Sequence, residues 1–412
     1  MERRSKGDFD ADEFVRSGKF QGLPRSHQAH AESRWDREER YPRLARQDDS
    51  KALKPRAHRI TDSMPERVKD NVKVPDSVPY TTPASEFIYG TGAVEAALRC
   101  SRRQLYKLYL YQATGEELSP TKVSLRKLAL SKNIEIKLAF AGWDRLLDKM
   151  SSSRPHNGCV LEASPLPKLP VQCFHTVPAV TESHFRVELA PQSREEAAIN
   201  GTNDRIQILQ PHLSEIGEQN SRFPVVLLLD GVVDTGNMGA IIRSAYFLGI
   251  DAIVFAGRNS APLSPVTIKT SAGAAENMPL LHVKNEVDFI QRSQKNGWRF
   301  YAADAPSPGA TYLDRLSADT KQDDSSLPVL QSPSVLMMGS EGSGLASHIK
   351  SHADAVVSIP GARHSIELGV KSDPARIDSL NVSVAAALLM EMFLRTPLGL
   401  SQPIQKGRGK MW

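Results

Sequence analysis

Residues 224–245 read Pro-Val-Val-Leu-Leu-Leu-Asp-Gly-Val-Val-Asp-Thr-Gly-Asn-Met-Gly-Ala-Ile-Ile-Arg-Ser-Ala. The unbroken apolar run before Asp230 is typical of a strand that is buried on both faces of a parallel sheet. The pattern over residues 238–248 predicts a helix, and the apolar residues 250–255 predict the next strand. Strand, helix and strand in this order form a βαβ unit, which connects parallel strands. The stretch therefore predicts an α/β domain.

The same pattern continues toward the C-terminus. Short apolar runs predict further strands at residues 299–303, 334–338 and 355–359, and residues 382–394 predict a final helix. The final helix is apolar on every side, so we expect it to be buried. These elements predict one α/β domain over residues 223–396, followed by a basic tail at residues 397–412.

Toward the N-terminus, residues 81–165 predict a second, smaller α/β domain. Alternating strand patterns and amphipathic helical patterns follow one another there, at residues 93–98, 105–111, 123–131, 134–138 and 143–150. Residues 166–222 are rich in Pro, Ser, Gln, Asn and Glu, which favours a linker or insertion, with some strand or helix near Phe185 and Ile206. Residues 1–80 are mostly charged and polar, which predicts a disordered extension.

Composition narrows the class of protein only slightly. The 412-residue chain carries a formal net charge of +5, which is compatible with a nucleic-acid partner. Its three cysteines form no Cys-x-x-Cys pair, so neither a disulfide framework nor a metal cluster is expected. No apolar run is long enough to cross a membrane. The N-terminus is rich in arginine, but acidic residues such as Asp8 and Glu13 argue against a clean transit peptide.

Three segments follow expected strands and carry polar residues suited to chemistry. In an open α/β sheet, ligands bind at the carboxyl ends of the strands. The first segment holds Asn237, either a helix N-cap or a site residue, and Arg243, either a surface side chain or a site residue. The second, residues 338–345, places Glu341 in a glycine-rich loop that is neither a Walker A loop nor a dinucleotide fingerprint. A flexible turn with a solvated acid is the alternative.

The third segment has two parts, Ile359-Pro-Gly361 and residues 379–387. Ser379 is either a cap of the final helix or a site residue. Asn381 is a polar residue in the first turn of a helix that we expect to be buried, so its amide needs partners. Those partners are either backbone groups or the polar groups of a site.

Taken in order, the three segments resemble the motifs of the SpoU class of SPOUT methyltransferases, the trefoil-knotted RNA ribose methylases. The resemblance covers residues 223–396 and includes the stretch from Ser264 to Leu280. Residues 87–163 resemble the family's N-terminal substrate-binding domain, through Tyr89-Gly90, Val94 and His156-Asn-Gly158. The resemblance implies a C-terminal α/β domain with a parallel sheet and a trefoil knot. Knots are very rare in proteins, so the sequence pattern alone would not predict this one.

The resemblance also implies a cofactor and a set of site residues. S-adenosylmethionine is expected in the loops of the second and third motifs, at Gly339, Gly342, Ile359, Gly361 and Leu380. The other polar positions of the family's site correspond to Asn237, Arg243, Glu341, Ser379 and Asn381. We expect Glu341 to hold Arg243, and the two asparagines and Ser379 to position the ribose and the cofactor loops.

The family assigns proton removal from the ribose hydroxyl to the arginine that matches Arg243. A guanidinium stays protonated in proteins, so a free-base arginine is physically unfavourable. We expect Arg243 instead to grip a phosphate and the hydroxyl, and to stabilise the developing alkoxide charge. The resemblance further implies RNA as partner, a homodimer, and neither a metal nor a membrane.

One departure from the family is an insertion of residues 362–378, which separates Gly361 from Ser379. It contains His364, Glu367, Lys371 and Arg376. Closure over the cofactor, contact with RNA and a surface loop without a role are the alternatives for this segment.

The long extension and insertions are similar to those of fungal mitochondrial large-subunit rRNA ribose methyltransferases. That similarity implies a mitochondrial protein and a target guanosine in the peptidyl-transferase region. A tRNA ribose methyltransferase of the same class is an alternative, because the motifs build the chemistry and not the RNA reader. A non-catalytic RNA-binding protein would lose the polar motif positions, and an oxidoreductase would show a Gly-x-Gly-x-x-Gly fingerprint, which is not found.

Overall fold

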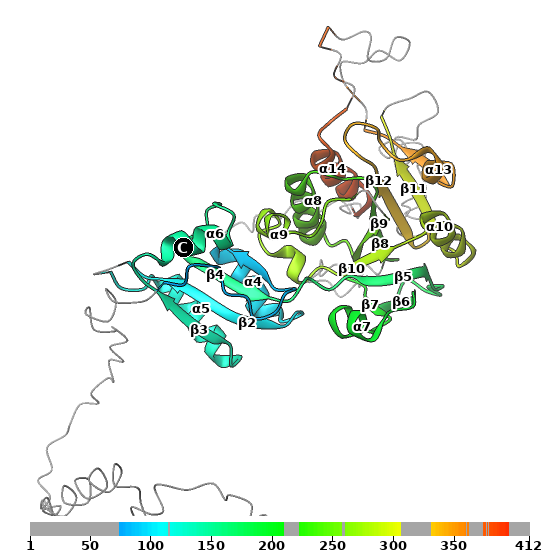
Figure 1. Ribbon diagram of the computed structural model, residues 1–412. Coiled ribbons are helices and arrows are strands. Elements are labelled where there is room, and N and C mark those ends of the chain that lie inside the picture. The colour runs from blue at the N-terminus through cyan, green and yellow to red at the C-terminus, as the bar shows by residue number, and fades with distance from the viewer. Residues whose placement is uncertain are drawn as a thin grey trace, which may run out of the picture. The chain divides into compact units, whose positions relative to one another are not determined.

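The computed structural model describes residues 74–113, 116–209, 222–257, 260–305, 331–359, 361, 374–375, 377 and 379–394 (Figure 1). Every described residue belongs to the unit Ser63–Trp412. The predicted disordered extension lies almost entirely outside the described residues, and the predicted basic tail lies wholly outside them.

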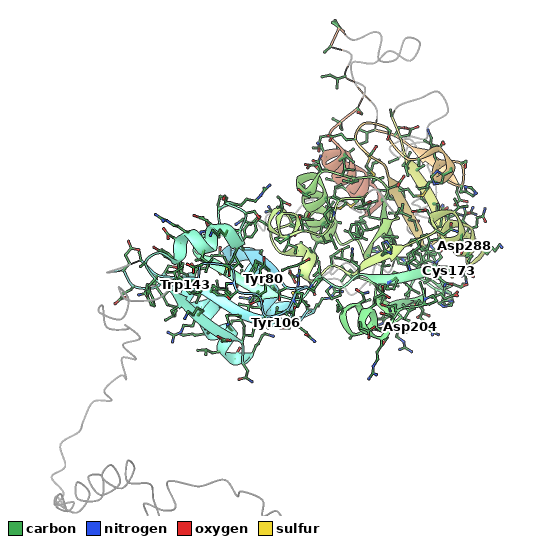
Figure 2. All side chains as sticks on the ribbon, in the orientation of Figure 1. Tyr80, Tyr106, Trp143, Cys173, Asp204 and Asp288 are labelled. Carbon is green, nitrogen blue, oxygen red and sulfur yellow. The ribbon has the colours of Figure 1, made fainter. Side chains whose placement is uncertain are left out.

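The smaller predicted domain is present as a four-stranded sheet with three helices. The strand order is β1-β4-β2-β3, with β4 antiparallel to both β1 and β2, and β2 parallel to β3. On one face, Trp143, which is labelled in Figure 2, packs against Tyr109 with ring centroids 6.0 Å apart. The bounds are β1 (Glu86–Tyr89), α4 (Thr91–Cys100), β2 (Leu105–Tyr111), α5 (Pro120–Ser131), β3 (Glu135–Ala139), α6 (Trp143–Met150) and β4 (Cys159–Ala163).

The larger domain is built on a nine-stranded sheet of order β13-β11-β12-β8-β9-β10-β5-β6-β7. Every pair from β13 to β5 is parallel, whereas β5/β6 and β6/β7 are antiparallel. The bounds are β5 (Leu169–Phe174), β6 (His184–Leu189), α7 (Arg194–Asn200), β7 (Arg205–Gln207), β8 (Val225–Leu229), α8 (Thr235–Leu248), β9 (Ala252–Ala256), α9 (Pro265–Thr270), η2 (Ala274–Glu276), β10 (Leu280–Val283), α10 (Glu286–Lys295), β11 (Arg299–Ala303), β12 (Ser334–Met338), α13 (Ser347–Lys350), β13 (Ala355–Val357) and α14 (Val382–Leu394).

Strand β8 shows why the parallel strands are apolar throughout. Alternate side chains of a strand point to opposite faces of the sheet. Val225, Leu227 and Leu229 join the core formed with α8, α9 and α14, while Val226 and Leu228 join the core formed with α10 and α13. The sheet is therefore covered on both faces, as the apolar run predicts, and the parallel α/β prediction is confirmed.

Of the linker or insertion predicted at residues 166–222, residues 169–207 are folded rather than a linker without regular structure. These residues form β5, β6, α7 and β7, and the three strands extend the large sheet. Phe174 and Phe185 anchor them, because both rings stack edge-on or tilted around Trp298 of the large domain. The sequence left strand or helix open near Phe185 and Ile206, and the structure has strands at both. Residues 210–221 lie outside the described part of the chain.

Replacing Phe174 by alanine is expected to destabilise the protein by about 3–5 kcal/mol, because the ring is fully buried among aromatic neighbours. Chemical denaturation with circular dichroism measures this change. Ile199→Ala on α7 is the control, since Ile199 is exposed and its truncation is expected to cost less than about 0.5 kcal/mol. Equal losses for both variants would mean that the strands β5–β7 add no core to the domain.

Helix α14 departs from the expectation of burial on all sides. Val382, Ala386 and Phe393 are buried, but Val384 and Leu388 are exposed on the other face. An apolar surface of α14 is thus open in a single chain. Within the described residues, no helix is both long and apolar enough to cross a membrane. The expected trefoil knot depends on the passage from β13 to α14, most of which lies outside those residues.

Candidate active site

The three motif segments meet in a cluster of hydrogen bonds. Asn381 Nδ2 donates to Glu341 Oε1 at 2.6 Å and to Asn237 Oδ1 at 3.2 Å. Asn237 Nδ2 donates to Glu341 Oε2 at 3.2 Å. Each residue comes from a different segment, after β8, after β12 and before α14. The structure therefore brings three of the five polar candidates into direct contact at the carboxyl edge of the sheet.

Asn237 reaches this cluster because it does not cap its helix. Asp234 is the N-cap of α8, and its Oδ1 accepts from the backbone N of Asn237 at 2.6 Å. The N-cap interpretation of Asn237 is thus wrong, because the cap sits three residues earlier. The sequence contained the signal, since aspartate is as favoured a cap as asparagine. With the cap supplied by Asp234, the Asn237 amide is available to bind Glu341.

Asn381 combines both of the roles that the sequence left open. Its Oδ1 accepts from the backbone N of Ser383 at 3.0 Å, and its own carbonyl accepts from Val384 N and Ala385 N. These bonds make Asn381, rather than Ser379, the residue that caps α14. Its Nδ2 group remains directed at Glu341. Asn381 and Glu341 are both exposed, so the cluster is open to solvent. This differs from the expected burial of Asn381.

The glycine-rich loop after β12 is a closed turn. Ser340 and Gly344 exchange two backbone hydrogen bonds, both 3.0 Å long, and Gly344 has a φ of +67°. Gly339 is buried against this turn, where a Cβ atom would lie 2.0 Å from the Gly344 carbonyl carbon. The tip of the loop, which carries Glu341 and Gly342, is exposed. The closed turn therefore fixes the position of Glu341 just beyond the end of β12.

Asp230, which was not among the sequence candidates, links the first and second motif segments. Its Oδ2 accepts from the backbone N of Ala346 at 3.3 Å, and its own N donates to Met338 O at 2.9 Å. These bonds join the first motif to the second. The signal was its place directly after a buried strand, where ligand-binding residues of α/β sheets lie.

Arg243 is placed differently from expectation. It lies on the exposed side of α8 and lines a cavity of about 830 Å³ together with Tyr246, Phe247 and Leu388. Among the described residues, Arg243 makes no hydrogen bond or ion pair. Both oxygens of Glu341 are engaged by asparagines, so the expected Glu341–Arg243 contact is not observed. The reason is helical geometry, because six residues at 100° each turn Arg243 away from Asn237.

The expected cofactor residues lie around the same edge. Gly339 and Gly342 belong to the turn that carries Glu341, and Leu380 precedes Asn381 in the chain. Ile359 is half-buried and follows β13. One strand, β11, lies between β13 and β12, so these two strands are about 10 Å apart. Gly361 is exposed, and no described contact joins it to the cluster.

The predictions for the insertion fall largely outside the described residues. Residues 362–373, 376 and 378 of the insertion are not among the described residues, so the roles weighed for His364, Glu367, Lys371 and Arg376 stay predictions. Ser379 is exposed, two residues before the helix cap. In the described part of the chain, no three His, Cys, Asp or Glu side chains are grouped to hold a metal ion.

Two families of known proteins match this chain. The SpoU rRNA Methylase family matches residues 224–391, which include the whole hydrogen-bonded cluster. The family described as RNA 2′-O ribose methyltransferase substrate binding matches residues 87–169, the smaller domain. Residues 170–223 lie between the two matches, and they contain most of the three-stranded extension of the sheet.

Curated relatives agree with both matches. The chain is 35% identical over 319 residues to rRNA methyltransferase 1, mitochondrial, of Saccharomyces cerevisiae, covering 76% of this chain and 70% of that protein. It is 32% identical over 306 residues to the protein of the same name from Schizosaccharomyces pombe, covering 74% and 88%. It is 28% identical over 316 residues to the 23S rRNA (guanosine-2′-O-)-methyltransferase RlmB of Pseudomonas aeruginosa, covering 76% and 98%. The family resemblance is thereby confirmed, and the chain belongs to the SpoU rRNA methylase family.

Proposed function

We propose that this chain transfers a methyl group from S-adenosylmethionine to the ribose 2′-hydroxyl of a guanosine in the peptidyl-transferase region of mitochondrial large-subunit rRNA. The observation that carries the proposal is the Asn237–Glu341–Asn381 cluster, which three distant segments build at the ligand-binding edge of the sheet. The names of the yeast relatives support the mitochondrial rRNA, and the name of RlmB supports the guanosine 2′-oxygen.

The residues around the cluster fit the proposed cofactor. S-adenosylmethionine supplies, when bound, an electrophilic methyl group on a sulfonium centre. The Gly344–Leu345 backbone fills the space where a Gly339 side chain would lie, so the turn keeps one closed shape, and its backbone groups are proposed to contact the cofactor. Half-buried Ile359 and exposed Leu380 offer apolar surface that suits an adenine ring. The Asn381–Glu341 bond ties Leu380 to the glycine turn, which places backbone donors and apolar surface together.

The polar residues of the site have separate proposed roles in methyl transfer. A ribose hydroxyl is a weak acid, so the enzyme must orient it and ease the loss of its proton. Arg243 is a charged, solvent-exposed fork, suited to grip the neighbouring phosphate and to stabilise the developing alkoxide. The proton then leaves to a phosphate oxygen or to water. Glu341 acts on the asparagines rather than on Arg243, since it fixes both amides for binding the ribose and cofactor.

The protein is further proposed to act as a homodimer through α8 and α14. Phe247 is 86% exposed, and Tyr246, Val384 and Leu388 are also exposed on these two helices. An exposed apolar patch of this kind marks an interface in soluble proteins. A second copy is the proposed occupant, because the two helices are adjacent and offer the same apolar surface in each copy, as a two-fold interface requires. Arg243 lies in this patch, so the dimer would place it near the partner chain.

Phe247→Asp is expected to convert the dimer to a monomer, because a carboxylate would be buried in an apolar interface. Light scattering coupled to size-exclusion chromatography measures the mass. Leu130→Asp on α5 is the matched control, since Leu130 is 56% exposed and lies in the smaller domain away from α8 and α14. A wild-type protein of monomer mass at working concentration would contradict the dimer.

Mapping of ribose methylation in cells that lack the protein tests the proposed substrate. The expected result is the loss of one 2′-O-methylguanosine from the peptidyl-transferase region of mitochondrial large-subunit rRNA, restored by the wild-type gene. Loss of a tRNA ribose methylation with intact rRNA would favour the tRNA alternative. A methylation pattern without any change would contradict both.

A further inference from the structure

We propose that residues 271–278, the docking turn, hold the RNA-binding domain at a fixed position against the catalytic domain. Gly273 and Glu276 of this turn, with Arg103 of the smaller domain, are then positioning residues for the RNA. The inference rests on the proposed function, and it assigns a role to the family stretch Ser264–Leu280, which the catalytic cluster does not use.

Close backbone packing is the first observation. Gly273 has a φ of +88°, and a Cβ atom there would lie 2.4 Å from Ala96 Cβ, 3.1 Å from Gly92 O and 3.3 Å from Ala93 Cα. All three atoms belong to α4 of the RNA-binding domain, and none is the end of a flexible side chain. Only glycine lets the turn and the helix approach so closely. The contact therefore fixes the distance between the two domains.

A buried ion pair is the second observation. Arg103 Nη2 donates to Glu276 Oε1 at 2.7 Å, and Arg103 Nε donates to Glu276 Oε2 at 3.1 Å, with both side chains fully buried. Arg103 Nη1 also donates to Ser164 O at 2.9 Å and pairs with Glu86 at 3.3 Å. Burial raises the pKa of the Glu276 carboxyl, and the adjacent Arg103 opposes that rise. Two buried charges require each other, so the forked geometry permits only one register of the domains.

Further contacts surround this pair. Arg102 Nη1 donates to Met278 O at 2.6 Å, at the end of the docking turn. Lys269 of α9 lies 5.9 Å from the ring centroid of Tyr89 and contacts Gly90. Tyr89-Gly90 and Ser264–Leu280 are two of the stretches that resemble the family outside the three motifs. They face each other across this interface.

The docking turn connects directly to the catalytic helix. It follows α9, which packs on α8 at Gly239, where a Cβ atom would lie 1.9 Å from Thr270 Oγ1 and 2.7 Å from Thr267 O. Helix α8 carries Asn237 and Arg243. Close contacts therefore connect α4, the docking turn, α9 and α8 in sequence. They restrict movement of the RNA-binding domain relative to the reacting groups on α8.

Methyl transfer depends strongly on this placement. The ribose oxygen must lie about 3–3.5 Å from the methyl carbon and in line with it, and a displacement of about 1 Å can cost 10²-fold in rate. A shifted RNA-binding domain would present the ribose out of line. Binding of S-adenosylmethionine would be unaffected, because the expected cofactor residues all lie in the catalytic domain.

Gly273→Ala in the full-length protein tests the inference, because its methyl group must push α4 away. We expect kcat/KM for rRNA to fall about 10²-fold, with unchanged affinity for S-adenosylmethionine by calorimetry. Gly297→Ala is the matched control, since Gly297 also has a φ of +88° but no atom lies within 4 Å of its added Cβ. The two variants place alanine at the same unfavourable φ, and only the first meets α4.

A second-site change sharpens the test. Ala96→Gly removes the nearest clashing methyl group, so Gly273→Ala/Ala96→Gly is expected to recover most of the lost kcat/KM. If Gly273→Ala does not fold, Glu276→Gln serves instead, because Arg103 keeps Glu86 and Ser164 O as partners. We expect Glu276→Gln to lower kcat/KM for rRNA at constant affinity for the cofactor.

The outcomes separate this inference from the proposed function. Equal losses in Gly273→Ala and Gly297→Ala, or a loss of cofactor affinity in Gly273→Ala, would overturn the positioning role. An unchanged kcat/KM for rRNA in Glu276→Gln would overturn it as well. A wild-type protein that binds S-adenosylmethionine weakly and methylates no RNA would overturn the proposed function itself.

Discussion

Arg243→Ala is expected to lower the rate of methyl transfer by about 10²–10³-fold, the usual effect of removing one group that stabilises an oxyanion. Arg243 is an exposed guanidinium on α8, away from the turn at Gly339, so affinity for S-adenosylmethionine should not change. Single-turnover assays with radiolabelled cofactor measure the rate, and calorimetry measures the affinity.

Two further variants show whether the fork or only the charge matters. Arg243→Lys keeps the charge but loses the planar pair of donors, so we expect it to recover little activity. Arg186→Ala is the matched control, because Arg186 is an exposed arginine of the strand extension, paired with Asp204. Transfer at the wild-type rate by Arg243→Ala would show that Arg243 has no part in the chemistry.

Gly339→Ala is expected to abolish binding of S-adenosylmethionine. Its Cβ would lie 2.0 Å from Gly344 C, 2.1 Å from Leu345 N and 2.3 Å from Gly344 O. All three are backbone atoms, which cannot rotate away as a side chain can. The turn must therefore open, and the two hydrogen bonds between Ser340 and Gly344 must break. Calorimetry should then detect no binding, and methyl transfer should be lost with it.

Gly342→Ala is the matched control for this change in loop shape. Gly342 lies in the same turn, but no atom lies within 4 Å of an added Cβ. We expect Gly342→Ala to keep the melting temperature of the wild type, which Gly339→Ala should lower. Normal cofactor affinity in Gly339→Ala would contradict the assignment of this turn to the cofactor.

Much of the catalytic domain could be predicted because its strands are buried on both faces. An uninterrupted apolar run such as residues 225–229 has few alternatives once a helix pattern follows it. The three motif segments could be assigned to one edge for the same reason, since parallel strands end together. Helix α14 was found at its observed bounds, because its apolar run begins and ends sharply.

The errors have physical causes as well. Strands β5–β7 are short and lie among polar residues, and only tertiary packing of Phe174 and Phe185 on Trp298 makes them stable. Such long-range contacts leave no local periodicity to read. The Glu341–Arg243 contact failed because Arg243 lies six residues after Asn237 on α8, so the two side chains leave the helix in different directions. The exposed face of α14 was missed because composition does not reveal which side meets the sheet.

We propose that the three motif segments form a single site that methylates a ribose oxygen. The most direct test incubates purified full-length protein with S-adenosylmethionine and a transcript of the peptidyl-transferase region, then digests the RNA and analyses the nucleosides by mass spectrometry. We expect 2′-O-methylguanosine at one position, and none when that guanosine is replaced by its 2′-deoxy analogue. A methyl group on a base, or methylation that persists on the 2′-deoxy analogue, would contradict the claim.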